Sequence, residues 1–198
     1  MMNFRKIALA IILTAFVFTG IVQAADTSIG VNLGTSEIEG WVDIKFNTLN
    51  TPLILGGGFL YSNDDYWITN VHMAVKDEVF TPGLSLGLGF RGVLGEVEIY
   101  RRDHEVGAFC LQFLGDYDFR KNTTRLPISI SVNISGAPEI LSFRDTERYI
   151  QFSTFFNFHI NDNATAFIGY RIIDIKFDEP VDRDWDDDAI LGGIRISF

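Results

Sequence analysis

The sequence predicts an all-β protein: a closed antiparallel transmembrane β-barrel that follows an N-terminal signal peptide. Apolar residues make up 47% of the chain, yet beyond residue 24 no apolar run approaches the ~20 residues of a membrane-spanning helix. Apolar and polar residues instead alternate, which gives a strand one apolar and one polar face. Within a bilayer only helices and closed barrels satisfy every backbone polar group, so exported strands with a lipid-type face imply a closed barrel.

The N-terminus predicts export. Arg5 and Lys6 form a basic start, Ile7–Val22 is almost wholly apolar, and small residues follow. We therefore expect a signal peptide over residues 1–24, cleaved between Ala24 and Ala25, and a barrel domain over residues 25–198. The alternative is an uncleaved anchor helix. Alanine rather than cysteine at position 25 argues against a lipoprotein.

Charge and cysteine content narrow the expected partners. Loss of the signal peptide lowers the formal net charge from −10 to −12, and an acidic chain repels nucleic acid, so no nucleic-acid partner is expected. Cys110 is the lone cysteine and can form no internal disulfide. The expected partners are outer-membrane lipid, lipopolysaccharide and the barrel assembly machinery.

The last strand, Ala189–Phe198, gives the clearest prediction of where the protein is located. Alternate residues are apolar, no turn or polar tail follows Phe198, and Gly193, Ile196 and Phe198 are spaced like the C-terminal signal that the assembly machinery reads. Leu191 departs from that pattern, which usually has a polar residue there. We expect a protein of the outer membrane of a Gram-negative bacterium.

Alternation upstream of this strand predicts a ten-stranded wall, in line with the even strand numbers of bacterial barrels. The other nine expected strands are Ser28–Gly34, Ile38–Phe46, Leu53–Tyr61, Trp67–Lys76, Leu84–Tyr100, Gly107–Phe119, Pro127–Ile134, Glu147–His159 and Ala164–Phe177. Eight strands is the alternative, if the N-terminal pair does not join the wall. The apolar parity changes within Leu84–Tyr100, and we expect a β-bulge near Arg91-Gly92, where glycine tolerates the kink, rather than a tight turn that splits the segment.

Charged segments between strands predict external loops, notably Arg101–Glu105 and the acidic stretch Asp178–Asp188. In the acidic stretch, carboxylate oxygens suit a hard divalent cation, and its weak metal-ligand candidates are Asp184, Asp186, Asp187 and Asp188. The spacing lacks the glycine and distal glutamate of a calcium loop. We therefore expect a solvated loop, no specific metal site and no cofactor.

Two histidines are the candidates for catalysis. His104 lies between Asp103 and Glu105, where a carboxylate could orient it, and His72 is expected to face the lumen with Asn70 and Lys76. No serine sits in a nucleophile elbow, and no two histidines have zinc-ligand spacing. We expect no catalytic residue; His104 is expected in a solvated loop tip and His72 as a packed lumen residue.

Charged residues on the polar faces are expected inside the barrel. The set comprises Glu37, Glu39, Asp43, Lys45, Arg91, Arg171 and Arg195. Opposite charges in a narrow lumen can pair and seal it, or they can line a selective path. Since eight strands enclose an interior just wide enough for side chains to fill, a general diffusion pore is not expected from ten.

Several segments together resemble the YfaZ family of small outer-membrane β-barrel proteins. They are the S-N-D-D hairpin tip, T-P-G-L-S-L-G-L-G-F-R-G-V-L, A-P-E-I-L-S-F-R-D-T-E-R-Y-I, I-G-Y-R and the closing G-I-R-I-S-F. The resemblance covers most of the chain after the signal peptide. It implies an exported outer-membrane barrel, and because the family has no established activity it supplies no catalytic residue.

These features favour a non-enzymatic outer-membrane barrel with a structural, surface-interaction or narrow-channel role. One alternative is a barrel enzyme acting on lipid or surface polymer through His104 or His72. Another is a soluble periplasmic ligand-binding barrel, because alternation alone does not say which face of a strand lies inside.

Overall fold

A computed structural model describes residues 25–47, 52–63, 66–99, 102–121, 126–178 and 183–198. The expected signal peptide and Ala24 lie outside these ranges. Within them, no helix combines the length and apolar character needed to cross a membrane.

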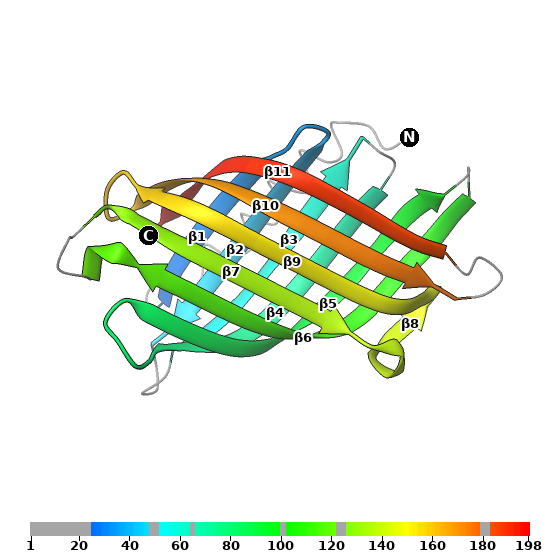
Figure 1. The fold of residues 1–198 in the computed structure, drawn as a ribbon, viewed down its shortest axis with the longest axis horizontal. Helices are drawn as coiled ribbons and strands as arrows, with labels where there is room; N and C mark the ends of the chain where they lie inside the picture. The colour runs from blue at the N-terminus through cyan, green and yellow to red at the C-terminus, as the bar shows by residue number, and fades with distance from the viewer. Residues whose placement is uncertain (1–24, 48–51, 64–65, 100–101, 122–125, 179–182) are drawn as a thin grey trace.

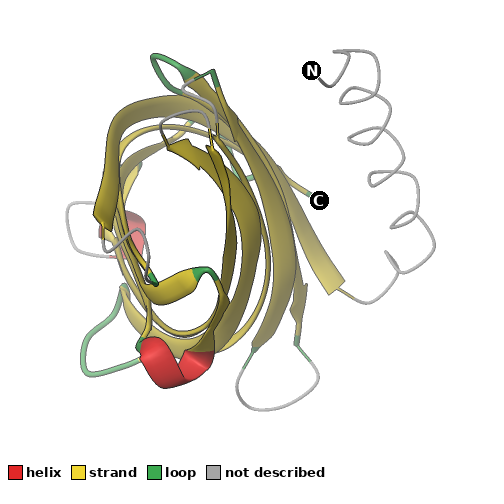
Figure 2. Ribbon diagram, turned by 90° about the vertical axis from the view of Figure 1, so that its right-hand side faces the viewer, coloured by secondary structure: helices red, strands yellow, loops and turns green. Residues whose placement is uncertain are grey.

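The described chain forms one antiparallel sheet of eleven strands that closes on itself. The long strands are β1 (Ala25–Leu33), β2 (Glu37–Phe46), β3 (Leu53–Ser62), β4 (Tyr66–Glu78), β5 (Leu84–Ile99), β6 (Arg102–Asp118), β7 (Ile128–Ala137), β9 (Thr146–His159), β10 (Ala164–Phe177) and β11 (Arg183–Ser197). The short β8 (Ser142–Arg144) pairs with Val106–Ala108 of β6, beyond the part of β6 that pairs with β7. Figure 1 shows the strands side by side, and Figure 2 shows them as a closed, flattened ring.

The ring closes between the first and last strands. β1 pairs with β11 from Ser28↔Ser197 to Leu33↔Gly192, and β1 also pairs with β2 along its length. The N-terminal pair is therefore part of the wall. The ten-strand prediction is confirmed and the eight-strand alternative is wrong.

The expected bulge in β5 is absent. β5 keeps a continuous register with both β4 and β6 through Arg91 and Gly92. The change of apolar parity that suggested a bulge has a different physical cause, which the two faces of the strand reveal.

The outer face of the barrel is apolar over its middle. Large apolar side chains point outward and are exposed, among them Val71 (68%), Leu88 (65%) and Ile168 (54%). A soluble barrel hides its apolar face inside, whereas a barrel in lipid presents it to the hydrocarbon. This exposure contradicts the soluble alternative.

The polarity of both faces inverts toward one end of the barrel. On β5 the outward residues are Leu88, Phe90 and Leu94, followed by Glu96 and Glu98. The inward residues change in the opposite sense, from Arg91 to the buried Val93 and Val97. The strand therefore leaves a lipid environment for an aqueous one without changing register, because the apolar face moves from outside to inside.

β10 shows the same inversion. Its outward residues pass from Ile172 to Asp174, while its inward residues pass from Arg171 to the buried Ile173 and Ile175. The inverted zone lies at the end opposite to the start of β1 and the end of β11. We call this the far end, and the other the N/C end.

Two predicted loops belong to this inverted zone and are strand. β6 begins at Arg102 and β11 at Arg183, so most of the described parts of Arg101–Glu105 and Asp178–Asp188 are paired strand. Asp103, Glu105, Asp184, Asp186 and Asp188 lie on the outer face, where strands that extend beyond the lipid meet water.

Candidate functional site in the barrel lumen

At the far end the lumen is filled by a cluster of apolar side chains, which we call the plug. Its buried members are Leu60, Tyr66, Ile68, Val93, Val97, Val106, Ala108, Cys110, Ala137, Tyr149, Ile173, Ile175 and Phe177, with Trp185 packed against them. The Tyr66 and Trp185 rings meet edge to face at 5.0 Å between centroids. They come from β4 and β11, which three strands separate, so the plug joins distant parts of the wall.

A buried ionic network lies beside the plug. The Arg171 guanidinium donates to Glu37 and, at 3.1 Å, to Glu39. Its side chain is 1% exposed. The Tyr66 hydroxyl lies 2.8 Å from a Glu37 carboxylate oxygen and 2.7 Å from one of Asp187. The inward charges here pair with one another, as one of the two sequence interpretations expected.

The plug ends at a sharp boundary. On each of four strands, an apolar or aromatic inward side chain of the plug is followed, two residues away, by a polar or charged inward side chain. The pairs are Ile68 and Asn70 on β4, Val93 and Arg91 on β5, Cys110 and Gln112 on β6, and Tyr149 and Gln151 on β9. Below this boundary the lumen is a polar cavity, which we call the chamber.

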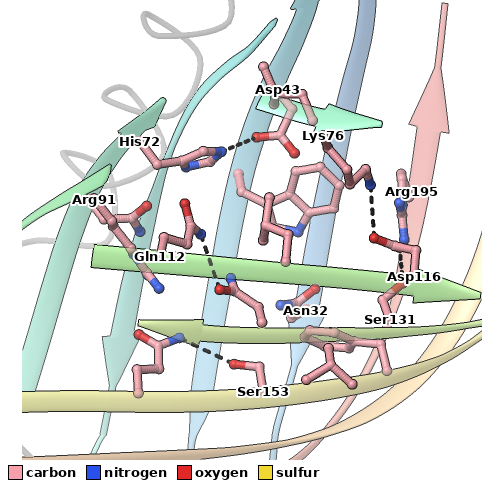
Figure 3. Close-up of a pocket in the computed structure, with 18 of the residues that line it drawn as sticks. Asn32, Asp43, His72, Lys76, Arg91, Gln112, Asp116, Ser131, Ser153 and Arg195 are labelled. Carbon is pink, nitrogen blue, oxygen red and sulfur yellow. Dashed lines mark hydrogen bonds and ion pairs between the residues drawn. The ribbon is translucent and has the colours of Figure 1, made fainter. Parts of the chain in front are cut away.

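The chamber has a volume of about 210 Å³. Figure 3 shows its lining side chains converging from many strands. At the boundary with the plug, Arg91 and Gln112 are only 5% and 4% exposed. Closer to the N/C end, the side chains of Lys76 and Asp116 are 29% and 27% exposed. Solvent therefore reaches the chamber from the N/C end.

Most charged groups of the chamber have partners. Lys76 Nζ lies 2.9 Å from Asp116, which also accepts a hydrogen bond of 2.7 Å from Ser131. His72 Nε2 lies 3.1 Å from Asp43 Oδ1, a contact at ion-pair distance without hydrogen-bond geometry. Figure 3 draws these contacts as dashed lines.

Arg91 differs from the other basic groups of the chamber. It takes part in no hydrogen bond or ion pair with any residue in the described ranges, and its Nε is buried without a partner. Arg195, by contrast, donates to Asn157 at 2.9 Å and lies over the Trp41 ring at 5.5 Å. Arg91 is thus a buried cation that pairs with no anionic side chain of the described segments.

The two candidate histidines, His104 and His72, lie on different strands and in different parts of the lumen. His104 is on β6 rather than in a loop, and it faces inward while the flanking Asp103 and Glu105 face outward. Its ring lies 5.3 Å from that of Phe177. His72 faces the lumen as predicted, and among the placed residues no hydroxyl or thiol lies within hydrogen-bond distance of it.

The acidic stretch is divided by the strand geometry. Asp184, Asp186 and Asp188 face outward on β11, whereas Asp187 faces inward to Tyr66. No group of three His, Cys, Asp or Glu side chains placed to hold a metal ion occurs in the described ranges. Alternation therefore separates Asp187 from the other three candidate carboxylates.

The residues of the expected assembly signal lie at the seam between β1 and β11. Ile196 and Phe198 face outward and are 46% and 66% exposed. Gly193 faces inward, close to the Val31 carbonyl and the Phe167 ring. Phe198 also exchanges backbone hydrogen bonds with Thr27 of β1.

The amino-acid pattern did not lead us to predict the plug, or that Arg91 differs from the other basic residues of the chamber. The evidence for the plug was present as the parity change in β5, because Val93 and Val97 share the parity of Arg91. Whether a carboxylate pairs with Arg91 depends on which strands face each other across the lumen, which alternation does not encode.

Comparison with known proteins supports the fold. No protein-family model and no curated protein sequence matches the chain. The solved NanC porin superposes with a TM-score of 0.50 at 8% identity, covering 88% of this chain and all 100% of that one. The KdgM porin (TM-score 0.43, 10% identity, 87% and 99% covered) and Neisserial surface protein A (0.37, 10%, 88% and 94%) are also similar. The chain has the fold of a small outer-membrane β-barrel.

Proposed function

We propose that this protein is a non-enzymatic barrel of the Gram-negative outer membrane and a member of the YfaZ family. In this proposal its lumen is a one-ended chamber: open toward the periplasm at the N/C end and closed by the plug at the far end. The outward apolar band supports a lipid environment. Lipid, lipopolysaccharide around the charged far end, and the assembly machinery are the partners we propose.

The plug is the observation that carries this proposal. Its inward side chains are buried on walls that face each other, and the Arg171 network adds a second closure. An open pore keeps polar side chains around a continuous aqueous path, whereas here apolar side chains fill one end. Of the roles considered, a narrow open channel therefore fits least, and a closed barrel with an accessible chamber fits best.

The reactivity of cysteine thiols tests the two zones. Cys110 is fully buried in the plug, so we expect it to resist a small water-soluble maleimide in the folded barrel and to react after unfolding. Ser131→Cys, made together with Cys110→Ala, places a thiol in the chamber and should react while the barrel is folded. Both proteins are purified in detergent and their folded state is checked by gel mobility without heating.

Equal reaction rates of the two folded proteins would overturn the one-ended chamber. Location is tested separately by fractionation: we expect the mature chain in outer-membrane fractions with heat-modifiable gel mobility. Recovery in the soluble periplasmic fraction would contradict the membrane assignment.

A further inference from the structure

We propose that the inner end of the chamber binds a small hydroxylated carboxylate, with Arg91 as the partner of its anionic group. This inference rests on the proposed one-ended chamber, because a ligand held there needs access from one end and a closed floor at the other. Three independent features support it: an unpaired buried cation, unpaired buried acceptors, and the size of the cavity.

The first of these features is the unpaired buried cation. The chamber's other basic side chains are matched: Lys76 to Asp116, His72 to Asp43, and Arg195 to Asn157 and Trp41. Arg91 is 95% buried with no such partner in the part of the chain that the structure describes. A buried charge is costly unless it is paired, and a guanidinium presents a fork of donors that matches a carboxylate.

The acceptors line the same chamber as Arg91. Gln112 uses its amide nitrogen on Asn133 Oδ1 at 3.2 Å, and Asn32 uses its own on Glu39 Oε2 at 2.8 Å. Since a carboxylate only accepts hydrogen bonds, the second contact fixes which way the Asn32 amide points. The amide oxygens of Gln112 and Asn32 are buried and have no donor from any placed residue. Buried acceptors of this kind require a donor, and hydroxyl groups supply one.

These groups surround one space. Arg91 and Gln112 lie on the neighbouring strands β5 and β6, and Asn32 lies on β1, on the opposite side of the ring. Figure 3 shows all three among the side chains that line the chamber. A single solute between them can meet the guanidinium on one side and an amide oxygen on the other.

The cavity limits the size of the ligand. Its volume of about 210 Å³ lies below the roughly 300–1,000 Å³ of sites for drug-sized ligands. It exceeds many times the roughly 10–15 Å³ that one water needs. The apolar side chains of Trp41, Leu114 and Phe155 also line it. The chamber therefore suits a monomeric hydroxy acid rather than a polymer.

Calorimetric titration of the purified full barrel in detergent tests the site, at constant ionic strength. Gluconate is the probe, and sorbitol, with the same number of carbons and no charge, is its neutral counterpart. We expect saturable gluconate binding and sorbitol binding at least tenfold weaker. Arg91→Gln should weaken gluconate binding roughly tenfold or more, as expected for loss of a charged hydrogen-bond partner. Arg102→Gln removes an exposed arginine outside the chamber and should change the affinity less than about twofold.

Equal binding of gluconate and sorbitol, or none of either, would overturn this proposal. If Arg91→Gln does not fold, Arg91→Lys replaces it, because lysine keeps the positive charge but lacks the forked donors of a guanidinium. If neither variant folds, the comparison of gluconate with sorbitol binding to the wild-type barrel decides whether the anion site exists. The cysteine-labelling experiment described above distinguishes failure of the one-ended chamber from failure of the anion site. A reactive Cys110 would refute the one-ended chamber, whereas a protected Cys110 without gluconate binding would refute only the anion site.

Discussion

Arg171 and Arg91 are inward arginines of one lumen with opposite surroundings. Arg171 is held by the carboxylates of Glu37 and Glu39, whereas no carboxylate in the described ranges pairs with Arg91. The sequence predicts that both side chains face inward, because their positions have the inward parity of their strands. Which arginine meets a carboxylate depends on the closure of the ring between β1 and β11, which brings β10 close to β2, so it emerges only from the folded barrel.

Arg171 should be essential for stability. Arg171→Met leaves the buried Glu37 and the partly buried Glu39 without their cation, and loss of one partner of a buried ion pair costs about 3–5 kcal/mol. We expect the free energy of unfolding in urea, followed by gel mobility, to fall by an amount of this order. Arg148→Met is the matched control: Arg148 pairs with Asp174, but both side chains are about two-fifths exposed.

A pair so exposed contributes about 0–1 kcal/mol, and Arg148→Met should lower stability no further than that. Similar losses for the two variants would show that the Arg171 network does not hold the lumen closed.

At the scale of the strands, alternation predicted most of the wall and failed where the environment changes. β9 follows the prediction, with Gln151 and Ser153 inward and Ile150 and Phe158 exposed outward. The bulge in β5 and the assignment of residues 183–188 to a loop were wrong for one reason. Both interpretations assumed that the outer face stays apolar along a whole strand, whereas it becomes charged above the lipid.

The seam between β1 and β11 gives a prediction for Gly193. A Cβ at this position would lie 2.2 Å from the Val31 carbonyl oxygen and 2.5 Å from the Phe167 ring. The carbonyl belongs to the backbone of β1, so relief requires the seam to shift, and overpacking of this kind costs about 1–3 kcal/mol. We expect Gly193→Ala to lower the unfolding free energy of the purified, refolded barrel by that order.

The adjacent Gly192→Ala is the control, since its Cβ would have no atom nearer than Phe167 O at 4.0 Å. It should be neutral or stabilising by up to about 1 kcal/mol. Refolding without the assembly machinery separates packing from signal recognition. A Gly193→Ala barrel as stable as wild type in vitro, yet poorly inserted in cells, would show that Gly193 acts only as part of the assembly signal.

At the scale of the whole molecule, two zones share one continuous wall. In the lipid zone the outside is apolar and the lumen polar; in the far zone the outside is charged and the lumen apolar. Burial of apolar surface drives the far zone together as it does in a soluble protein. The plug is thus the hydrophobic core of the part of the barrel that stands beyond the lipid, and the closure of the lumen that we propose follows from it.

The central claim is that this core closes the barrel, and single-channel recording in planar lipid bilayers tests it most directly. We expect purified wild-type protein to give no steady conductance, because the plug interrupts the aqueous path. The double variant Tyr66→Ala with Trp185→Ala removes the two rings that meet at 5.0 Å and should give measurable open-channel steps while retaining folded gel mobility. Steady ohmic conductance from the wild-type barrel would contradict the account.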